Sequence, residues 1–476
     1  MFIGRKEQLD ALSLLWGKRT SSLVTCRGRR RIGKSTLIEE FARRTADHFI
    51  NIVGLSPRKG MTDRRQRVNF CEELADQTGG SIGHARNWTA AFRMLDERIP
   101  KEGRTVVLLD EISWMGSRNP DFAGYLKTAW DKRLKKHDNL VLVLCGSVSS
   151  WIADNILDST GFVGRDSLDI EVGELSLAES VKMLGGSDGH ISSREIFDFL
   201  SVTGGVPKYL EEIHPEWSFE ENVRQLCFMP RGTLFREFNE TFSEVFGKKV
   251  SSRGEVLRTL AETPLSVVEI ARALGRTPNG KLSRTLRDLV YAGFVSRDSG
   301  LNPMTQEPLR MERYRIRDNY TRFYLKEIEP RHQAIEKGLF KFSSVEQLTG
   351  WRGLLGLQFE NMVLNHVEDL FRHFGLERSL VVSAAPFTRR AGKGVKGCQI
   401  DLLIQTERMA LVVEIKHGKR IEHGIIEEVR EKVANLEVAK GLSVRTALVY
   451  DGTLAPSVEA DRYFDFLLPF DRLLCE

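Results

Sequence analysis

The sequence predicts a multidomain α/β protein whose first domain is built on a parallel sheet. Three observations lead to this fold class: the chain has 476 residues, an apolar run at 23–26 enters a glycine loop, and two later runs, at 106–109 and 140–145, are continuously apolar. Continuous apolar runs are typical of parallel strands buried on both faces. A chain of this length usually has more than one hydrophobic core, so we expect two to four domains.

The composition is that of an ordinary globular protein, with 41% hydrophobic and 28% charged residues. The net charge of +5 gives a mild basic bias, which is compatible with a nucleic-acid partner. Residues 1–7 contain no apolar leader segment and no later run reaches membrane-spanning length, so we expect a cytoplasmic protein without membrane contact. The six cysteines show no CxxC spacing, which predicts reduced thiols rather than a zinc site or disulfides.

The glycine loop runs from Gly28 to Ser35 and has the spacing GxxxxGK[ST]. Its glycines let backbone amides converge on a polyphosphate, and a helix that begins near Gly33 adds its positive end. Lys34 can reach the β- and γ-phosphates, and the Ser35 hydroxyl suits the shell of Mg²⁺. The pattern predicts a P-loop that binds ATP and Mg²⁺; the alternative is a glycine-rich turn that only precedes a helix.

A partner motif, Asp110-Glu111, ends the second apolar run. Ligands of open α/β sheets bind at this end of the strands, and in P-loop ATPases the first acid holds the Mg²⁺ shell while the second polarises the attacking water. Ser147 ends the third run and either senses the γ-phosphate or caps the next helix. The residues expected to bind nucleotide are Gly28, Arg29, Arg30, Arg31, Ile32, Gly33, Lys34, Ser35, Thr36, Asp110 and Ser147.

Two flanking segments are expected to be helical. Residues 4–15 carry leucines at helical spacing and either cover the adenine or pack on the sheet. Residues 51–87 are polar and basic, and we expect surface helices there that form a basic contact face.

Several short motifs resemble those of archaeal-type ATPases, a branch of the AAA+ superfamily. In chain order they are Gly4-Arg5, the Walker A loop, the Walker B pair Asp110-Glu111, the strand end at 145–147, Gly164-Arg165 and residues 204–210. The resemblance covers the first half and implies a RecA-like core followed by a helical lid. Arg165 looks like the arginine that acts on the γ-phosphate in cis or across a subunit boundary, which implies a homo-oligomer; the alternative is a structural salt bridge. Residues 161–163 depart from the Pro-Leu-Tyr type of turn common in the family.

Residues 256–290 fall into three short helical patterns, and a strand-like segment follows Gly293. This order is typical of a winged helix-turn-helix. The third helix carries Lys281, Arg284 and Arg287 at spacings that share one face, so it either contacts DNA or serves as a packing module.

Near the carboxy terminus, two strand-like runs at 399–404 and 411–416 are joined by a short turn. Pairing them as a hairpin brings Asp401, Glu414 and Lys416 together on one face. The two carboxylates and the Ile415 carbonyl suit a divalent metal, and Lys416 would orient or activate a water for phosphodiester hydrolysis. The alternative is an ordinary ladder of cross-strand charges.

This arrangement resembles the PD-(D/E)XK nuclease core, although Ile400 replaces the signature proline. The resemblance implies an acid on the preceding helix, Glu360, and a following helix that begins at 424–427. The basic loop 389–397 lies directly before Asp401 and suits a phosphate backbone. A degenerate fold that binds without cutting is the other interpretation.

The predicted domains are an ATPase core at 1–175, a helical lid and connector at 176–249, a winged helix and linker at 250–328, and a nuclease-like domain at 329–476. We therefore expect Mg²⁺-dependent ATP hydrolysis coupled to DNA binding and metal-dependent DNA cleavage. The alternative is an ATP-controlled signalling or assembly switch whose last domain binds DNA or protein without cutting.

Overall fold

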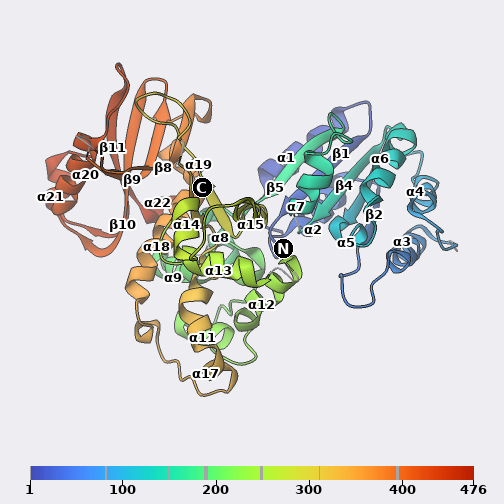
Figure 1. Ribbon diagram of the computed structural model, residues 1–476, viewed down its shortest axis with the longest axis horizontal. Coiled ribbons are helices and arrows are strands. Elements are labelled where there is room, and N and C mark those ends of the chain that lie inside the picture. Colours follow the sequence, from blue (N-terminus) through green and yellow to red (C-terminus); the bar gives the residue numbers. More distant parts are fainter. Residues whose placement is uncertain are drawn as a thin grey trace. The chain divides into compact units, whose positions relative to one another are not determined.

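The computed structural model describes residues 2–80, 83–147, 149–186, 191–246, 250–309, 311–392 and 396–475. The chain divides into two compact units (Figure 1). The first contains the residues as far as Glu174 together with Arg287–Gly293, and the second contains Leu175–Leu286 and Phe294–Glu476. The four-domain division expected from the sequence stays a prediction.

The first unit contains a five-stranded sheet in the order β2-β3-β4-β1-β5, and every pair in it is parallel. Its strands are β1 (Ser22–Gly28), β2 (His48–Val53), β3 (Thr105–Asp110), β4 (Leu140–Gly146) and β5 (Asp166–Val172). Every residue of β3 and β4 is buried, which explains their continuous apolar sequence. The predicted α/β class with a parallel sheet is therefore confirmed.

Helices cover this sheet and complete its core. They are α1 (Lys6–Leu14), α2 (Lys34–Thr45), α3 (Asp63–Thr78), α4 (Trp88–Asp96), α5 (Ile112–Met115), α6 (Phe122–Lys132) and α7 (Ser149–Ile152). Alternate residues of the central strands, such as Leu109 and Leu142, share one core cluster with Phe92 of α4 and Phe122 of α6. These alternate strand residues share one face of the sheet, so α4 and α6 pack on that face.

The segment 51–87 differs from the expected surface helices. Residues 51–53 complete β2, an edge strand that pairs with β3 through Asn51 and Leu108. Asn51 interrupts the apolar residues of β2, so this edge strand lacks the continuous apolar run of the buried strands. Helix α3 also packs inward, since Phe70 and Leu74 are buried.

The second unit begins with a helical region. Its helices are α8 (Leu177–Met183), α9 (Ser193–Thr203), α10 (Pro207–Leu210), α11 (Phe219–Cys227), α12 (Thr233–Phe246), α13 (Val250–Leu260) and α14 (Val267–Ala273). Helix α15 (Gly280–Tyr291) begins in this unit, and its residues from Arg287 onward belong to the first unit. Capping boxes start α8 at Ser176 and α14 at Ser266. Strands β6 (Val295–Asp298) and β7 (Arg313–Ile316) pair antiparallel after α15. This element order is the one expected of a winged helix, and that assignment stays a prediction.

The unit continues with α16 (Asn319–Phe323), α17 (His332–Glu336), α18 (Trp351–Asn365) and α19 (Val367–His373), followed by a mixed five-stranded sheet in the order β12-β11-β10-β9-β8. The strands are β8 (Val381–Arg389), β9 (Cys398–Thr406), β10 (Met409–Ile421), β11 (Ser443–Leu454) and β12 (Phe466–Pro469), with helices α20 (Gly424–Asn435), α21 (Pro456–Asp461) and α22 (Phe470–Leu473). Ile426 and Val429 of α20 pack in one core cluster with Leu403 of β9 and Val412 of β10.

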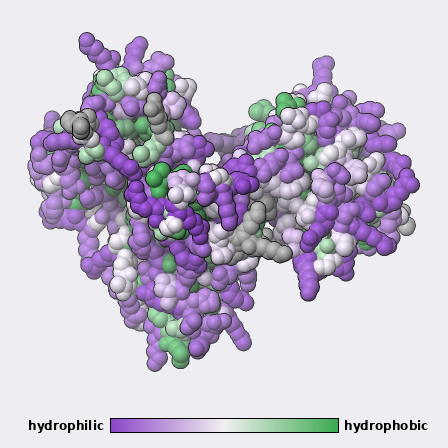
Figure 2. All heavy atoms as spheres, viewed as in Figure 1, coloured by the Kyte–Doolittle hydropathy of each residue, from purple (hydrophilic) through white to green (hydrophobic). Residues whose placement is uncertain are grey.

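On the face drawn in Figure 2, hydrophilic residues predominate and hydrophobic residues form only small separate areas. Within the described ranges, every helix is too short or too polar to cross a membrane.

Candidate functional site

The backbone of the predicted P-loop leaves no room for side chains at its first glycine. A Cβ added at Gly28 would lie 2.3 Å from the carbonyl oxygen of Val172 on β5. Gly33 has φ 85°, a value that favours glycine, and directly precedes α2. Gly33 is the N-cap of α2 and has no side chain to cap the first-turn amides, which is an arrangement suited to an anion.

Three polar side chains form a chain of hydrogen bonds at the carboxyl edge of the sheet. The Lys34 ammonium donates to the hydroxyl of Ser147 at 3.0 Å and to the Arg29 carbonyl at 3.0 Å. The Ser147 hydroxyl in turn donates to Glu111 Oε1 at 2.7 Å. The ends of β1, β3 and β4 thus bring the Walker A lysine, the Walker B glutamate and Ser147 together.

The two side chains expected around Mg²⁺ also meet. The Ser35 hydroxyl donates to Asp110 Oδ2 at 2.6 Å, and the Glu111 amide donates to Asp110 Oδ1 at 2.8 Å. A hydroxyl and a carboxylate are the hard oxygen donors that Mg²⁺ prefers, so these residues fit that ion. Glu111 itself has φ 48°, an uncommon value outside glycine that is typical of functional turns.

Arg5 is a residue of this region that the sequence interpretation did not place at the site. Its guanidinium donates to the Ile32 carbonyl at 3.2 Å and to the Gly173 carbonyl at 2.6 Å. It therefore ties the P-loop to the end of β5. The only sequence signal was its place in the Gly4-Arg5 motif.

The other predicted nucleotide contacts differ in burial. Arg29 and Ile32 are buried, Arg30 and Arg31 are half-buried, and Thr36 is exposed. Their roles toward a nucleotide stay predictions.

Arg165 forms an intramolecular salt bridge in this structure. Its guanidinium donates to Asp131 of α6 through Nε at 2.8 Å and Nη2 at 3.1 Å. This hydrogen bonding lowers the pKa of the Asp131 carboxyl. This geometry is the one expected if Arg165 forms a structural salt bridge. Its action on the γ-phosphate as an arginine finger stays a prediction.

A second group of charged residues lies in the carboxy-terminal sheet. Strands β9 and β10 pair antiparallel, with Val413 opposite Leu402, so the next residues along, Glu414 and Asp401, are neighbours. The Ile415 amide donates to Asp401 Oδ2 at 3.0 Å. The hairpin thus brings the two expected carboxylates together, with side chains only 5% and 15% exposed.

The lysine beside these carboxylates is Lys432 of α20, which the sequence interpretation missed. Its ammonium donates to Glu414 Oε2 and lies 3.8 Å from Asp401 Oδ1. The ammonium of Lys416, which was also expected here, lies 3.2 Å from Glu428 Oε2, and its charge acts to lower the pKa of both Asp401 and Glu414. Lys432 could not be found from strand alternation, because it arrives from a helix packed across the hairpin.

Burial shapes the electrostatics of this group. It raises the pKa of Glu414 to about 7, with a further rise from Asp401 and an opposing effect of Lys432. Burial also raises the pKa of Asp401. Burial works against the charge of Lys432, but the two carboxylates outweigh it and its pKa is raised. Asp401 and Glu414 therefore have a reduced tendency to ionise, whereas Lys432 keeps its positive charge.

Glu360, the acid expected on the preceding helix, belongs to α18. Burial, followed by the charge of Asp401, raises the pKa of Glu360 to about 7. The structure therefore places Glu360 within electrostatic range of the hairpin acids.

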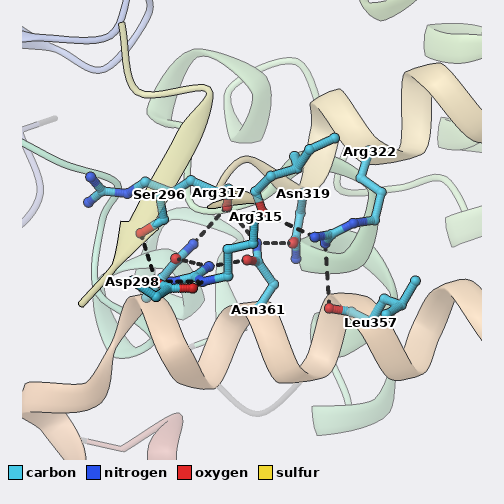
Figure 3. A network of polar contacts seen from close by, with 10 residues as sticks. Ser296, Asp298, Arg315, Arg317, Asn319, Arg322, Leu357 and Asn361 are labelled. Carbon is cyan, nitrogen blue, oxygen red and sulfur yellow. Dashed lines mark hydrogen bonds and ion pairs between the residues drawn. The ribbon is translucent and has the colours of Figure 1, made fainter. Parts of the chain in front are cut away.

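A buried polar network holds the part of α18 that carries Glu360 (Figure 3). Asn361 donates to Asn319 Oδ1 at 2.8 Å and accepts from Arg315 of β7. Arg315 also bonds Asp298 of β6 at 3.0 Å. The helix is therefore fixed to both strands and to α16.

The basic residues predicted to contact DNA are only partly described. Lys281, Arg284 and Arg287 are exposed on α15, and Arg287 lies 3.3 Å from Asp154. In the loop 389–397, Arg390 bonds Glu269 of α14 at 2.6 Å, whereas Lys393 lies outside the described residues.

The described residues contain no group of three or more His, Cys, Asp or Glu side chains placed to hold a metal ion. A metal at the hairpin would therefore depend on Asp401 and Glu414 with a backbone carbonyl. These are suitable oxygen donors, although an ammonium already contacts both acids.

Comparison with known proteins identifies relatives of this chain. The family of ATPase domains found predominantly in Archaea matches residues 2–213. An uncharacterized protein of Methanocaldococcus jannaschii is 23% identical over 425 residues, or 87% of each chain. An uncharacterized ATP-binding protein of the same organism is 44% identical over 41 residues, which are 9% of this chain and 70% of the relative. The Walker-type ATPase of Pyrococcus abyssi has a similar fold, with TM-score 0.52 and 17% identity over 68% of this chain and 96% of its own.

Proposed function

We propose that the chain couples Mg²⁺-dependent ATP hydrolysis to DNA binding and metal-dependent DNA cleavage, and the match of residues 2–213 to the ATPase domains found predominantly in Archaea supports the ATPase part. The observation that carries the ATPase part is the chain of hydrogen bonds from Lys34 through Ser147 to Glu111. These three groups lie where a γ-phosphate and its attacking water would meet at a P-loop.

In this proposal each residue of the nucleotide site has its own task. Lys34 exchanges its bond to Ser147 for bonds to the β- and γ-phosphates. Glu111, once released by the Ser147 hydroxyl, accepts the proton of the attacking water. Ser35 and Asp110 hold Mg²⁺, which supplies neutralisation of the phosphate charge. Arg165 acts on the γ-phosphate only if it first leaves Asp131, and in a homo-oligomer it would do so across the subunit boundary.

The second part of the proposal concerns the hairpin acids. Asp401 and Glu414 are suited to hold a divalent metal, which supplies charge neutralisation at a scissile phosphate and a more acidic water. Lys416 is exposed enough to meet a phosphate, and its side chain is 42% accessible. Glu360 is suited to exchange a proton near neutral pH.

DNA is the proposed partner because basic side chains are exposed near both predicted binding elements. Lys281 and Arg284 lie on α15, and Arg390 precedes the hairpin. Such side chains bind the phosphate backbone without regard to sequence.

The second candidate function is an ATP-controlled switch that binds DNA or protein without cutting. The contact of Lys432 with Glu414 and Asp401 favours it, because a permanent ion pair would leave no place for a metal. An assay with plasmid and single-stranded DNA, with and without Mg²⁺ and ATP, separates the two. Cleavage that requires Mg²⁺ supports the nuclease; intact DNA under every condition, with normal ATP hydrolysis, supports the switch.

A further inference from the structure

Lys432 is the one ammonium among the described residues that is hydrogen-bonded to a hairpin acid. Its side chain is 24% exposed, so its stem is largely packed while one side remains open to solvent. Glu414 and Asp401 present their carboxylate oxygens to this ammonium. Lys432 therefore contacts both of the carboxylates that would hold a divalent metal ion.

We infer that Lys432 is the resident counter-ion of the Asp401–Glu414 pair, and that a divalent cation binds there only by displacing it. This inference rests on the proposed metal-dependent function of the same hairpin. In this inference Lys432 neutralises the two acids and competes with the metal ion, whereas Lys416 has the separate role of orienting water.

Electrostatics gives the first reason. Two buried carboxylates repel each other and are costly to desolvate unless a cation lies between them. An ammonium supplies one positive charge and a divalent ion supplies two, and both need the same carboxylate lone pairs. The two cations would repel each other strongly within about 4 Å, so they bind in competition.

Helix α20 also carries an alternative ion-pair partner for Lys432. Glu428 lies four residues earlier on the same helix, which is the spacing of a favourable intrahelical ion pair. Glu428 is now the partner of Lys416 at 3.2 Å. Displaced Lys432 would pair with Glu428, and Lys416 would then be released to contact a bound phosphate. Metal entry is thus linked to an exchange of partners between two lysines.

Metal affinity tests this directly. We would titrate Mn²⁺ into the full chain by calorimetry without nucleotide, in an Asp110→Asn background that removes the carboxylate ligand expected at the P-loop. Lys432→Met keeps the size of the side chain and should raise the Mn²⁺ affinity by about tenfold or more. Lys419→Met removes one positive charge from an exposed position of the same strand, β10, so it should change the affinity less than threefold. Adding Asp401→Asn to Lys432→Met should abolish the gain.

A second measurement uses the chain with Lys432 intact, because Lys432→Met leaves two buried acids unpaired and can unfold the sheet. Reductive methylation followed by mass spectrometry reports how accessible each lysine is. Saturating Mn²⁺ should increase the modification of Lys432 severalfold and leave that of exposed Lys419 unchanged.

The outcomes separate the inference from the proposed function. Equal Mn²⁺ affinity of wild type and Lys432→Met, with Lys432 equally modified at all Mn²⁺ concentrations, overturns the counter-ion role and leaves the metal site standing. Absence of Mn²⁺ binding in every folded variant overturns both the inference and the metal-dependent function.

Discussion

The hydroxyl of Ser147 donates a hydrogen bond of 2.7 Å to the carboxylate of Glu111. The same hydroxyl accepts a bond from Lys34. Ser147 therefore bonds both Glu111, which is proposed to activate water, and Lys34, which is proposed to bind phosphate. Nucleotide binding, by drawing Lys34 to the phosphates, would loosen both contacts at once.

The first prediction separates binding from hydrolysis. Lys34→Ala should weaken ATP binding, because the ammonium neutralises phosphate charge. Glu111→Gln should bind ATP with near wild-type affinity and lose hydrolysis by about a hundredfold or more, because an amide accepts no proton. Equilibrium binding of a fluorescent nucleotide and phosphate release measure the two effects. Normal turnover by Glu111→Gln would remove that residue from the role and leave the P-loop assignment in place.

A second prediction concerns Arg165, now paired with Asp131. If Arg165 acts across a subunit boundary, mixing Arg165→Ala with Glu111→Gln protein should restore part of the ATPase activity, since one mixed interface keeps both groups. Phosphate release is measured over a range of mixing ratios. Absence of rescue at every ratio would favour the salt bridge as its whole role.

The exposed face of α15 gives a third prediction. Each phosphate contact that is lost should reduce the salt slope of log K for duplex DNA by about 0.9. The triple variant of Lys281, Arg284 and Arg287 to alanine should therefore bind DNA more weakly and with a flatter slope. Fluorescence anisotropy at several salt concentrations measures both. Unchanged affinity and slope would make α15 a packing element.

The fourth prediction follows from Glu360, whose pKa rises from an ordinary value of 4.5 to about 7. Between these pH values the folded chain binds more protons than the unfolded chain, so this group's contribution to the free energy of unfolding falls as pH rises from about 4.5 to 7. Glu360→Gln avoids that loss and should be more stable than wild type at pH 8, by on the order of 1–3 kcal/mol, with a smaller difference at pH 5. Urea unfolding at both pH values measures it. Equal gains at pH 5 and pH 8 would show that charge is not the cause.

Much of the first unit could be predicted because its signals are local. The spacing of Gly28 and Gly33 and the apolar runs of β3 and β4 specify a P-loop between buried parallel strands. Strand β2 was missed because it is short and its apolar residues are interrupted by Asn51, so it lacks the continuous apolar run that marks β3 and β4. The carboxylate pair Asp401 and Glu414 could be predicted from the short turn that sets the hairpin register.

The contacts that sequence reasoning missed are tertiary. Lys432 reaches Glu414 only because α20 folds back over β10, and no periodicity in either element indicates that pairing. The bond between Arg5 and the Ile32 carbonyl likewise joins segments whose relation is set by the sheet order. Side chains that meet across elements need the packing itself to be known.

The measurement that tests the central proposal most directly compares DNA cleavage and ATP hydrolysis in wild type and Asp401→Ala. Asp401 and the P-loop belong to different compact units, so their chemistry should be separable. We predict that wild type cuts DNA with Mg²⁺ or Mn²⁺, and that Asp401→Ala loses cleavage while its ATP hydrolysis remains within about twofold of wild type. Wild-type protein that hydrolyses ATP but cuts no DNA form with either metal would contradict the nuclease proposal and leave the switch in its place.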